Sequence, residues 1–222
     1  MNAHKNAASN PNAMLRKPID KRRYLSSKPL VGPVKLFDAP PMCDGAAAII
    51  LASREVALEA ERNGLPMVRV RASAIGTDCL SLDDRIDKLS LTGARRSCHS
   101  AYEQAGVTAA DIDLFELHDA YTVITALSLE AAGFAKDGEG ARFGQDGEIA
   151  LNGRLPISTF GGLKARGHPV GATGVYQMAE TYQQLTETAG ENQVPNAEVA
   201  LVQNIGGTGA SVVSHILTKE AA

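Results

Sequence analysis

Strand and helix patterns alternate along the chain, and this alternation constrains the fold more than any other feature of the sequence. Residues 54–63 have a helical pattern that ends at Gly64, and Met67–Ala74 (MVRVRASA) alternates apolar and polar residues as a half-buried strand does. A second helical pattern covers residues 92–104, and the apolar run Leu114–Leu117 follows as a strand. Alternation of this kind predicts a layered α/β domain.

The C-terminal part of the chain continues the pattern. Residues 121–132 and 171–189 have helical spacing, and the charged, glycine-rich residues 136–154 between them are expected to form a surface excursion. Two apolar strands, Val199–Gln203 and Val212–Leu217, close the chain. Their short connection predicts a hairpin added to the sheet. We therefore expect a layered mixed sheet with helices on both sides.

The N-terminal part differs in composition. Residues 1–41 are rich in Asn, Pro, Lys and Arg, show little periodicity, and are expected to be loop-like. The apolar run Ala46–Ala52 (AAAIILA) predicts a buried strand, and Ser53 is expected to cap the helix that follows. We divide the chain into residues 1–53 and a domain of residues 54–222.

Composition excludes several classes of protein. The net charge is −3 and the pI is about 6.0, whereas nucleic-acid binders gather an excess of Lys and Arg. The one basic cluster, Lys17–Arg23, is expected to be a solvated surface or an oligomer contact, with an anionic ligand as the alternative. No apolar run reaches the roughly 18 residues of a membrane span, and the first residues lack a signal-peptide core. A soluble cytoplasmic protein is the expectation.

Three cysteines, Cys43, Cys79 and Cys98, lie far apart and match no metal or redox pattern. An odd number of cysteines without a secretion signal predicts reduced thiols. The simplest interpretation of each one is a small buried apolar residue. We expect neither a metal site nor a tightly bound cofactor.

The first candidate site is the string Glu116–Tyr121 (ELHDAY), where a strand pattern gives way to a helix. Ligands of α/β proteins bind at the carboxyl ends of strands. His118 is suited to donating a hydrogen bond to a substrate oxygen or to moving a proton, and Asp119 to capping the helix or orienting the histidine. The alternative is a capping and packing role without catalysis.

The second candidate site is Gly161–Gly174, which holds five glycines in fourteen residues. So many glycines allow backbone N–H groups to approach a ligand near a helix start. His168, followed by Pro169, is suited there to proton transfer or oxyanion binding. The alternative is a tight turn that carries an incidental histidine.

The third candidate site is Asn204–Gly209 (NIGGTG). Only 13 residues follow Gly209, which leaves no room for the helix and strand of a dinucleotide-binding unit. A hairpin turn whose amides face a ligand is one interpretation, and a purely structural turn is the other.

Taken in this order, the three loops resemble the thiolase superfamily. The most specific element is Gly167-His168-Pro169 within its glycine-rich segment. The string His118–Tyr121 (HDAY) resembles the sterol-carrier-protein-type and archaeal branch. The biosynthetic and degradative branches carry Asn-Glu-Ala-Phe at this place. Asp44–Ala48 looks like the last strand region of a thiolase N-terminal domain, and His4–Pro11 looks like the end of the loop domain. The resemblance implies that residues 1–53 are a remnant of those two domains and that the rest is the C-terminal domain.

What the resemblance implies is a carbon–carbon bond made or broken beside a coenzyme A thioester. In such enzymes a cysteine takes the acyl group, and His168 would activate it and help to form an oxyanion hole. His118 would bind the thioester oxygen of the second substrate. Backbone amides near the reacting acyl group would come from the glycines Gly167, Gly206, Gly207 and Gly209.

This sequence also departs from the family. Thiolases are about twice as long, and their nucleophilic cysteine lies in the N-terminal half. Asn204 stands where many members have a second catalytic cysteine, and Ala120 stands where this branch often has one. Three interpretations follow: an acyltransferase half, a thiolase-fold retro-aldolase in which Tyr121 or Tyr176 moves the proton, or a non-catalytic scaffold subunit.

The resemblance also implies partners. Acyl-CoA is the expected substrate, with coenzyme A as a substrate rather than a resident cofactor. A homo- or hetero-oligomer with the missing thiolase half is expected, because an isolated half would expose a large apolar face. Thiolases of this branch often associate with a small zinc-ribbon and OB-fold accessory protein. Neither nucleic acid nor a membrane is expected as a partner.

Overall fold

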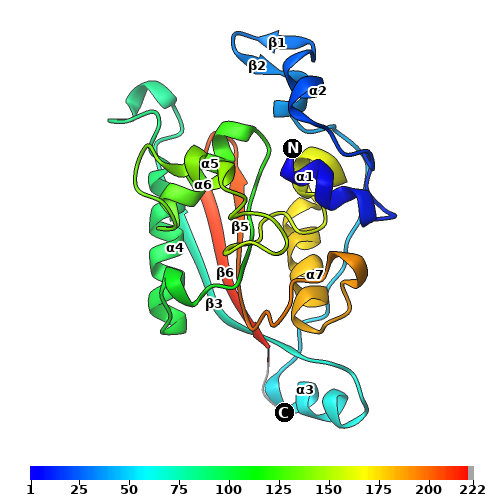
Figure 1. Ribbon diagram of the computed structural model, residues 1–222. Coiled ribbons are helices and arrows are strands. Elements are labelled where there is room, and N and C mark those ends of the chain that lie inside the picture. The colour runs from blue at the N-terminus through cyan, green and yellow to red at the C-terminus, as the bar shows by residue number, and fades with distance from the viewer. Residues whose placement is uncertain (220–222) are drawn as a thin grey trace.

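A four-stranded mixed sheet forms the centre of the molecule in the computed structural model, which describes residues 1–219 (Figure 1). The strands lie in the order β3-β6-β5-β4. Their bounds are β3 Val68–Thr77, β4 Leu114–Glu116, β5 Val199–Gly206 and β6 Ser211–Lys219. β6 pairs antiparallel with both β3 and β5, and β4 runs parallel to β5. The predicted mixed sheet and terminal hairpin are confirmed.

Helices cover both faces of this sheet, as the sequence predicts. α4 (Thr92–Ala105) and α5 (Thr122–Ala131) lie on one face and α7 (Thr173–Leu185) on the other (Figure 1). Alternate residues of a strand point to opposite faces, so Leu201 packs beneath α4 and α5 while Ala200 packs beneath α7. Two apolar layers therefore clamp the sheet.

Helix ends follow the sequence signals in some places and not in others. α3 (Arg54–Arg62) ends before Gly64, which has φ +81°, as expected of a glycine after a helix. Ser53 stands at the N-cap position with extended backbone, but no backbone amide donates to its hydroxyl, which itself donates to the Glu55 carboxylate (3.1 Å). The predicted side-chain cap is therefore not formed, because the hydroxyl is directed to a charged acceptor rather than to the free amides of the first turn. The expected surface excursion contains one further helix, α6 (Gly140–Gln145).

The first residues of the chain pack against the sheet domain. α1 (Asn2–Asn6) contacts the π-helical turn η5 (Gly162–Arg166), and the Asn6 amide donates to the carbonyls of Ile157 and Ser158 (3.2 and 3.1 Å). Beyond this anchor, α2 (Lys21–Leu25) and a hairpin of β1 (Pro29–Val31) and β2 (Val34–Lys35) project from the body (Figure 1). The remaining short 3₁₀ helices are η1 Ala7–Ser9, η2 Leu36–Asp38, η3 Leu82–Asp84, η4 Ala109–Asp111 and η6 Gly190–Asn192.

The predicted buried strand at residues 46–52 is not formed. The segment lies extended without pairing to any described strand, and Ile50 and Leu51 are 96% and 74% exposed. An apolar strand needs a neighbouring sheet edge to pair with its backbone. Among the described residues, no strand edge pairs with residues 46–52. The prediction was wrong for this chain on its own, and the run is an unpartnered apolar surface.

The three cysteines are unpaired thiols with different surroundings. Cys98 is buried as expected, Cys43 is half-buried, and Cys79 is exposed, so the predicted burial was wrong for Cys79. Cys79 lies in the loop after β3, where its carbonyl accepts hydrogen bonds from Arg85 while its side chain stays in solvent. Within residues 1–219, no group of His, Cys, Asp and Glu side chains is arranged to hold a metal ion. Among the helices described, none has both the length and the apolar character needed to cross a membrane.

Candidate functional site

The first two candidate loops meet at their histidines. The His118 and His168 rings lie with centroids 5.3 Å apart and nearly perpendicular, at 87°. His118 follows the carboxyl end of β4. Its contact with His168, which follows η5, brings the second loop to the same end of the sheet. Only 8% of His118 is exposed. The contact brings together the two histidines to which the family resemblance assigns roles in one reaction.

Asp119 joins the two loops through the backbone. Its Oδ1 accepts from the Leu163 amide (2.7 Å), so the side chain does not cap α5 as one interpretation expected. Gly162 makes this approach feasible: a Cβ at that residue would lie 2.5 Å from both Asp119 carboxylate oxygens, and its φ is +53°. A side chain at residue 162 would therefore separate the loops.

His168 is oriented by the helix that follows it. Its Nδ1 lies 2.7 Å from the Thr173 hydroxyl, which also lies 3.2 Å from the Pro169 carbonyl. When the hydroxyl donates its one proton to that carbonyl, Oγ1 accepts from His168 and the imidazole proton is on Nδ1. Nε2 is then the basic nitrogen. The His168 amide donates to the Pro41 carbonyl (3.1 Å), which holds the loop against the residues that lead into the extended run 46–52.

Asn204 lies inside β5, so the prediction that it begins the final turn was wrong. β5 extends to Gly206, which pairs with Ser211, and only the residues after it turn. The Asn204 amide nitrogen lies 3.3 Å from His118 Nδ1 and donates to Gln177 Oε1 over 3.0 Å. Asn204 therefore belongs to the site through His118 rather than through the turn.

Sequence reasoning missed Gln177. This side chain of α7 is fully buried and bonded to backbone carbonyls of two strands, β4 and β5. The signal for it was a polar stripe on the helix face that packs against the sheet. Its members are Thr173, Gln177, Thr181 and Gln184, spaced three or four residues apart and all fully buried.

The other expected site residues have less contact with the histidines. The Tyr121 side chain is 47% exposed, and its hydroxyl bonds to no described residue. Gly207 and Gly209 form the turn with φ +58° and +92°. Gly167 has φ +121°, and a Cβ there would lie 2.7 Å from the Cys43 sulfur. The roles of Tyr121 and of these glycines stay predictions.

Buried ionisable side chains lie next to the two histidine loops. Arg166 pairs with Glu180 of α7 (2.7 Å), and both side chains are at least 93% buried. Burial works to raise the pKa of Glu180, and the Arg166 guanidinium opposes this rise by favouring the charged carboxylate. Burial likewise works to raise the pKa of Glu116, whereas the amide and hydroxyl of Thr159 both donate to its carboxylate and oppose the rise. The ion pair fastens the glycine-rich loop to α7.

Both histidines are neutral at neutral pH. Burial, followed by the nearby His168, lowers the pKa of His118 to about 4. Burial, followed by Arg166, lowers the pKa of His168 as well. Two uncharged imidazoles in contact can serve different purposes, because one can accept a proton while the other donates a hydrogen bond.

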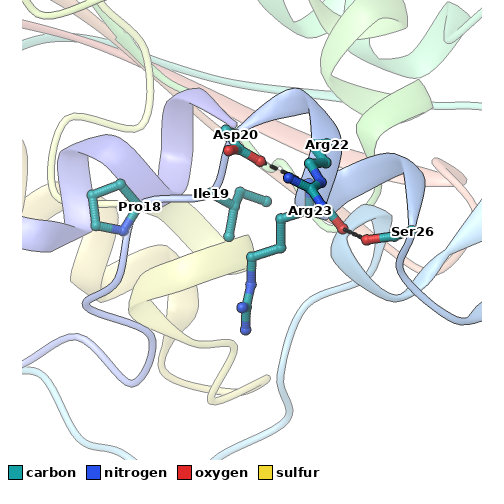
Figure 2. A pocket seen from close by; sticks show the side chains of 6 residues that line it. All are labelled: Pro18, Ile19, Asp20, Arg22, Arg23 and Ser26. Carbon is teal, nitrogen blue, oxygen red and sulfur yellow. Dashed lines mark hydrogen bonds between the residues drawn. The ribbon is translucent and has the colours of Figure 1, made fainter.

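Two of the hollows on the described surface lie beside regions that the sequence singles out. One borders the site and has a volume of about 540 Å³; it lies between Cys43–Ala47 and Pro169–Val175. The other lies at the basic cluster (Figure 2) and is lined by Pro18, Ile19, Asp20, Arg22, Arg23 and Ser26. There Asp20 caps α2 by accepting from the Arg23 amide (2.7 Å). The cluster lies on the surface as predicted.

Comparison with known proteins identifies the family. Residues 74–219 match the model described as "Thiolase C-terminal domain-like". The acetyl-CoA acetyltransferase of Methanothermobacter thermautotrophicus is 39% identical over 216 residues, which cover 97% of this chain and 56% of the relative. Sterol carrier protein 2 of Oryctolagus cuniculus is 35% identical over 216 residues, or 95% of this chain and 39% of the relative.

Among solved structures, the one titled "Ltp2-ChsH2(DUF35) aldolase" superposes with a TM-score of 0.87 at 25% identity, over 100% of this chain and 57% of that one. The chain spans about half the length of the acetyltransferase that it matches and less of the sterol carrier protein. The family match and the shared fold agree with the resemblance expected from the three loops. The chain belongs to the thiolase superfamily and carries its C-terminal domain.

Proposed function

We propose that this chain is the C-terminal half of a thiolase-type acyltransferase that acts on acyl-CoA and 3-ketoacyl-CoA thioesters. The observation that carries the proposal is the contact of two neutral histidines, His118 and His168, at the carboxyl end of the sheet. The nucleophilic cysteine would come from outside these 222 residues, either from more of the same polypeptide or from a partner subunit.

The reaction follows from the protonation of His168. Its Nε2 would take the proton of the cysteine thiol, and the thiolate would attack the ketone carbon of a 3-ketoacyl-CoA. The carbon–carbon bond then breaks, leaving the acyl group on sulfur and an acetyl-CoA enolate that takes up a proton. His118 and the amides near Gly206–Gly209 would hold the thioester oxygen as it gains charge. Coenzyme A would finally take the acyl group, and its thiol proton would return to the enzyme.

The extended segment supports a partner for this half. Ile50 and Leu51 are exposed, and the residues that lead into this segment touch the site, because Pro41 and Met42 pair with His168. A thiolase N-terminal half, covalently joined or separate, would cover these side chains. The small zinc-ribbon and OB-fold accessory protein stays part of this proposal, as do the division at residue 53 and a cytoplasmic location.

The test is His168→Ala in the complete enzyme, assayed by thioester exchange. Loss of the base should lower turnover by about 10²–10⁴-fold. His99→Ala is the matched control, because the His99 side chain is 74% exposed on α4, away from the site. Unchanged turnover in His168→Ala would contradict the role assigned to it.

A retro-aldolase is the second candidate, favoured by the superposition on a protein titled as an aldolase. A base would remove the hydroxyl proton of a β-hydroxyacyl-CoA, the Cα–Cβ bond would break, and a free aldehyde or ketone would leave. The enolate left on the thioester would take a proton at Cα. Tyr121, exposed at the start of α5, or Tyr176, whose ring lies 4.8 Å from the Arg166 guanidinium, would move the proton.

Products separate these two functions and the third one, a non-catalytic scaffold. The complete protein would be incubated with a β-hydroxyacyl-CoA and, separately, with a 3-ketoacyl-CoA and free coenzyme A. A carbonyl product formed without consumption of coenzyme A indicates the aldolase, and a new acyl-CoA indicates the acyltransferase. Neither product, from a complex that contains the nucleophilic cysteine, indicates the scaffold.

A further inference from the structure

Gln177 is anchored so that its amide has only one orientation. Its Nε2 donates to the carbonyls of Glu116 (3.1 Å), the last residue of β4, and Gln203 (3.0 Å), inside β5. These carbonyls can only accept, and they use both N–H groups of the amide. Turning the amide over would place Oε1 against two carbonyl oxygens in a fully buried site. Oε1 is therefore fixed, and it faces Asn204.

The orientation of Asn204 follows from that of Gln177. Gln177 Oε1 accepts one N–H of the Asn204 amide (3.0 Å), so Asn204 cannot present its own oxygen there. The second N–H of the same nitrogen points to His118 Nδ1, 3.3 Å away. His118 Nδ1 must then accept, since the group that faces it is a donor.

A neutral imidazole has one proton, so an accepting Nδ1 places that proton on Nε2. We propose that Gln177 is a positioning residue that, through Asn204, fixes His118 as the tautomer protonated at Nε2. Gln177 is fully buried and hydrogen-bonds to Asn204 rather than to His118 among the described residues, so its influence passes through the Asn204 amide. His118 is thereby prepared to donate a hydrogen bond from Nε2.

We call the hydrogen-bonded series Gln177–Asn204–His118 the relay. It gives the two adjacent histidines opposite functions. With the Thr173 hydroxyl donating to Pro169, His168 carries its proton on Nδ1 and has a basic Nε2, whereas Asn204 holds the proton of His118 on Nε2. One ring is prepared to take a proton and the other to stabilise a developing oxyanion. The catalytic consequence rests on the proposed function, but the tautomer itself does not.

The experiment measures the tautomer by long-range ¹H–¹⁵N correlation spectra of the protein as purified, at pH 7, with the imidazole nitrogens labelled. These spectra separate protonated from unprotonated ring nitrogens, and His118→Gln assigns the signals by their loss. We expect Nε2 of His118 to be protonated and Nδ1 unprotonated. A proton on Nδ1, or on both nitrogens, overturns the proposal.

Two variants test the relay. Gln177→Met removes the acceptor that fixes Asn204, so His118 should become a mixture of tautomers. Asn204→Asp replaces the donor with a carboxylate, so the proton should move to Nδ1. Gln184→Met is the matched control, because Gln184 is an equally buried glutamine of α7 whose amide bonds to Asn192 and Val194 instead. It should leave His118 unchanged.

An unchanged His118 tautomer in both Gln177→Met and Asn204→Asp overturns the relay. If Gln177→Met does not fold, Asn204→Asp and the wild-type spectrum decide. In the complete enzyme, Gln177→Met should lower kcat by up to about 100-fold with little change in KM. A shifted tautomer together with full activity of His168→Ala leaves the relay standing and removes the proposed function. An unshifted tautomer together with an inactive His168→Ala does the reverse.

Discussion

Two segments of this chain that carry isoleucine and leucine have opposite surroundings, and the more apolar of the two is the exposed one. Ile216 lies in β6, paired on both sides and fully buried between the sheet and α4. Ile50 lies in AAAIILA, a run at least as apolar, and is 96% exposed. The difference is not in local propensity but in the neighbours that the described chain supplies. An apolar run becomes a strand only where another edge accepts its backbone.

The largest expected effect tests charges in the buried region against charges on the surface. Arg166→Met leaves Glu180 buried without its partner, and we expect the free energy of unfolding to fall by about 3–5 kcal/mol. Arg95 pairs with Asp137 at 2.6 Å, but their side chains are 47% and 78% exposed. Arg95→Met should cost about 1 kcal/mol or less. Urea unfolding of both variants measures the contrast.

A double variant sharpens this prediction. Arg166→Met combined with Glu180→Met removes the unpaired carboxyl as well as the guanidinium. It should therefore be more stable than Arg166→Met alone. If the single and the double variants unfold at the same urea concentration, burial of the charge is not the source of the cost.

The second prediction addresses the two isoleucines directly. Ile216→Ala should lower the free energy of unfolding by about 2–5 kcal/mol, because it leaves a cavity in the core. Ile50→Ala should change it by less than about 0.5 kcal/mol in the chain alone. Chemical unfolding of the 222-residue chain measures both. A large loss in Ile50→Ala would mean that the extended segment is covered by this chain itself, which would contradict the comparison.

The same contrast explains how much the sequence could predict. Elements that satisfy their own region, such as α4 with its terminal Gly106 or the β5–β6 hairpin, follow from periodicity and turn residues, which act locally. The strand expected at 46–52 failed because burial is a property of a neighbour, not of the run. The contact of the two histidines was predictable from strand ends and from the family resemblance. Gln177 was not, because its importance depends on which carbonyls it reaches across the sheet.

The third prediction concerns the point where the start of the chain joins the buried region. Asn6→Ala removes hydrogen bonds to the carbonyls of Ile157 and Ser158, both across a long stretch of sequence. Ile157 O keeps a bond from the Asn2 amide (3.4 Å) and Ser158 O keeps one from the Gly161 amide (2.8 Å), so neither acceptor is left bare. The loss of two buried hydrogen bonds should cost about 1–3 kcal/mol. Asn63→Ala removes one exposed bond, from Asn63 to the Glu59 carbonyl (2.9 Å), and should cost less than about 0.5 kcal/mol. Equal losses in thermal unfolding would show that α1 is not docked.

The smallest expected effect on the free energy of unfolding at neutral pH is that of replacing His4. This effect becomes larger only in acid. His4 is 2% exposed in α1, and neither ring nitrogen has a hydrogen-bond partner among the described residues. Burial, followed by the charges of the N-terminus and Lys164, lowers its pKa to about 4 from 6.5. Below pH 6.5 the His4 imidazole is therefore protonated in the unfolded chain, whereas in the folded chain it stays neutral until about pH 4. The stability contributed by the neutral form is complete above pH 6.5 and is lost as the pH falls through this window.

His4→Phe should accordingly remove part of the acid-side decline while changing little above pH 7, because the Phe37 ring that His4 meets edge-on accepts an aromatic neighbour. The exposed His99 supplies the control, since His99→Phe should leave the decline as it is. The measurement is the unfolding free energy of each variant and of wild type from pH 4 to 8, read as differences so that other titrating groups cancel. Parallel curves for His4→Phe and wild type would show that α1 leaves His4 open to water, and the start of the chain would then belong with the exposed segment rather than with the sheet.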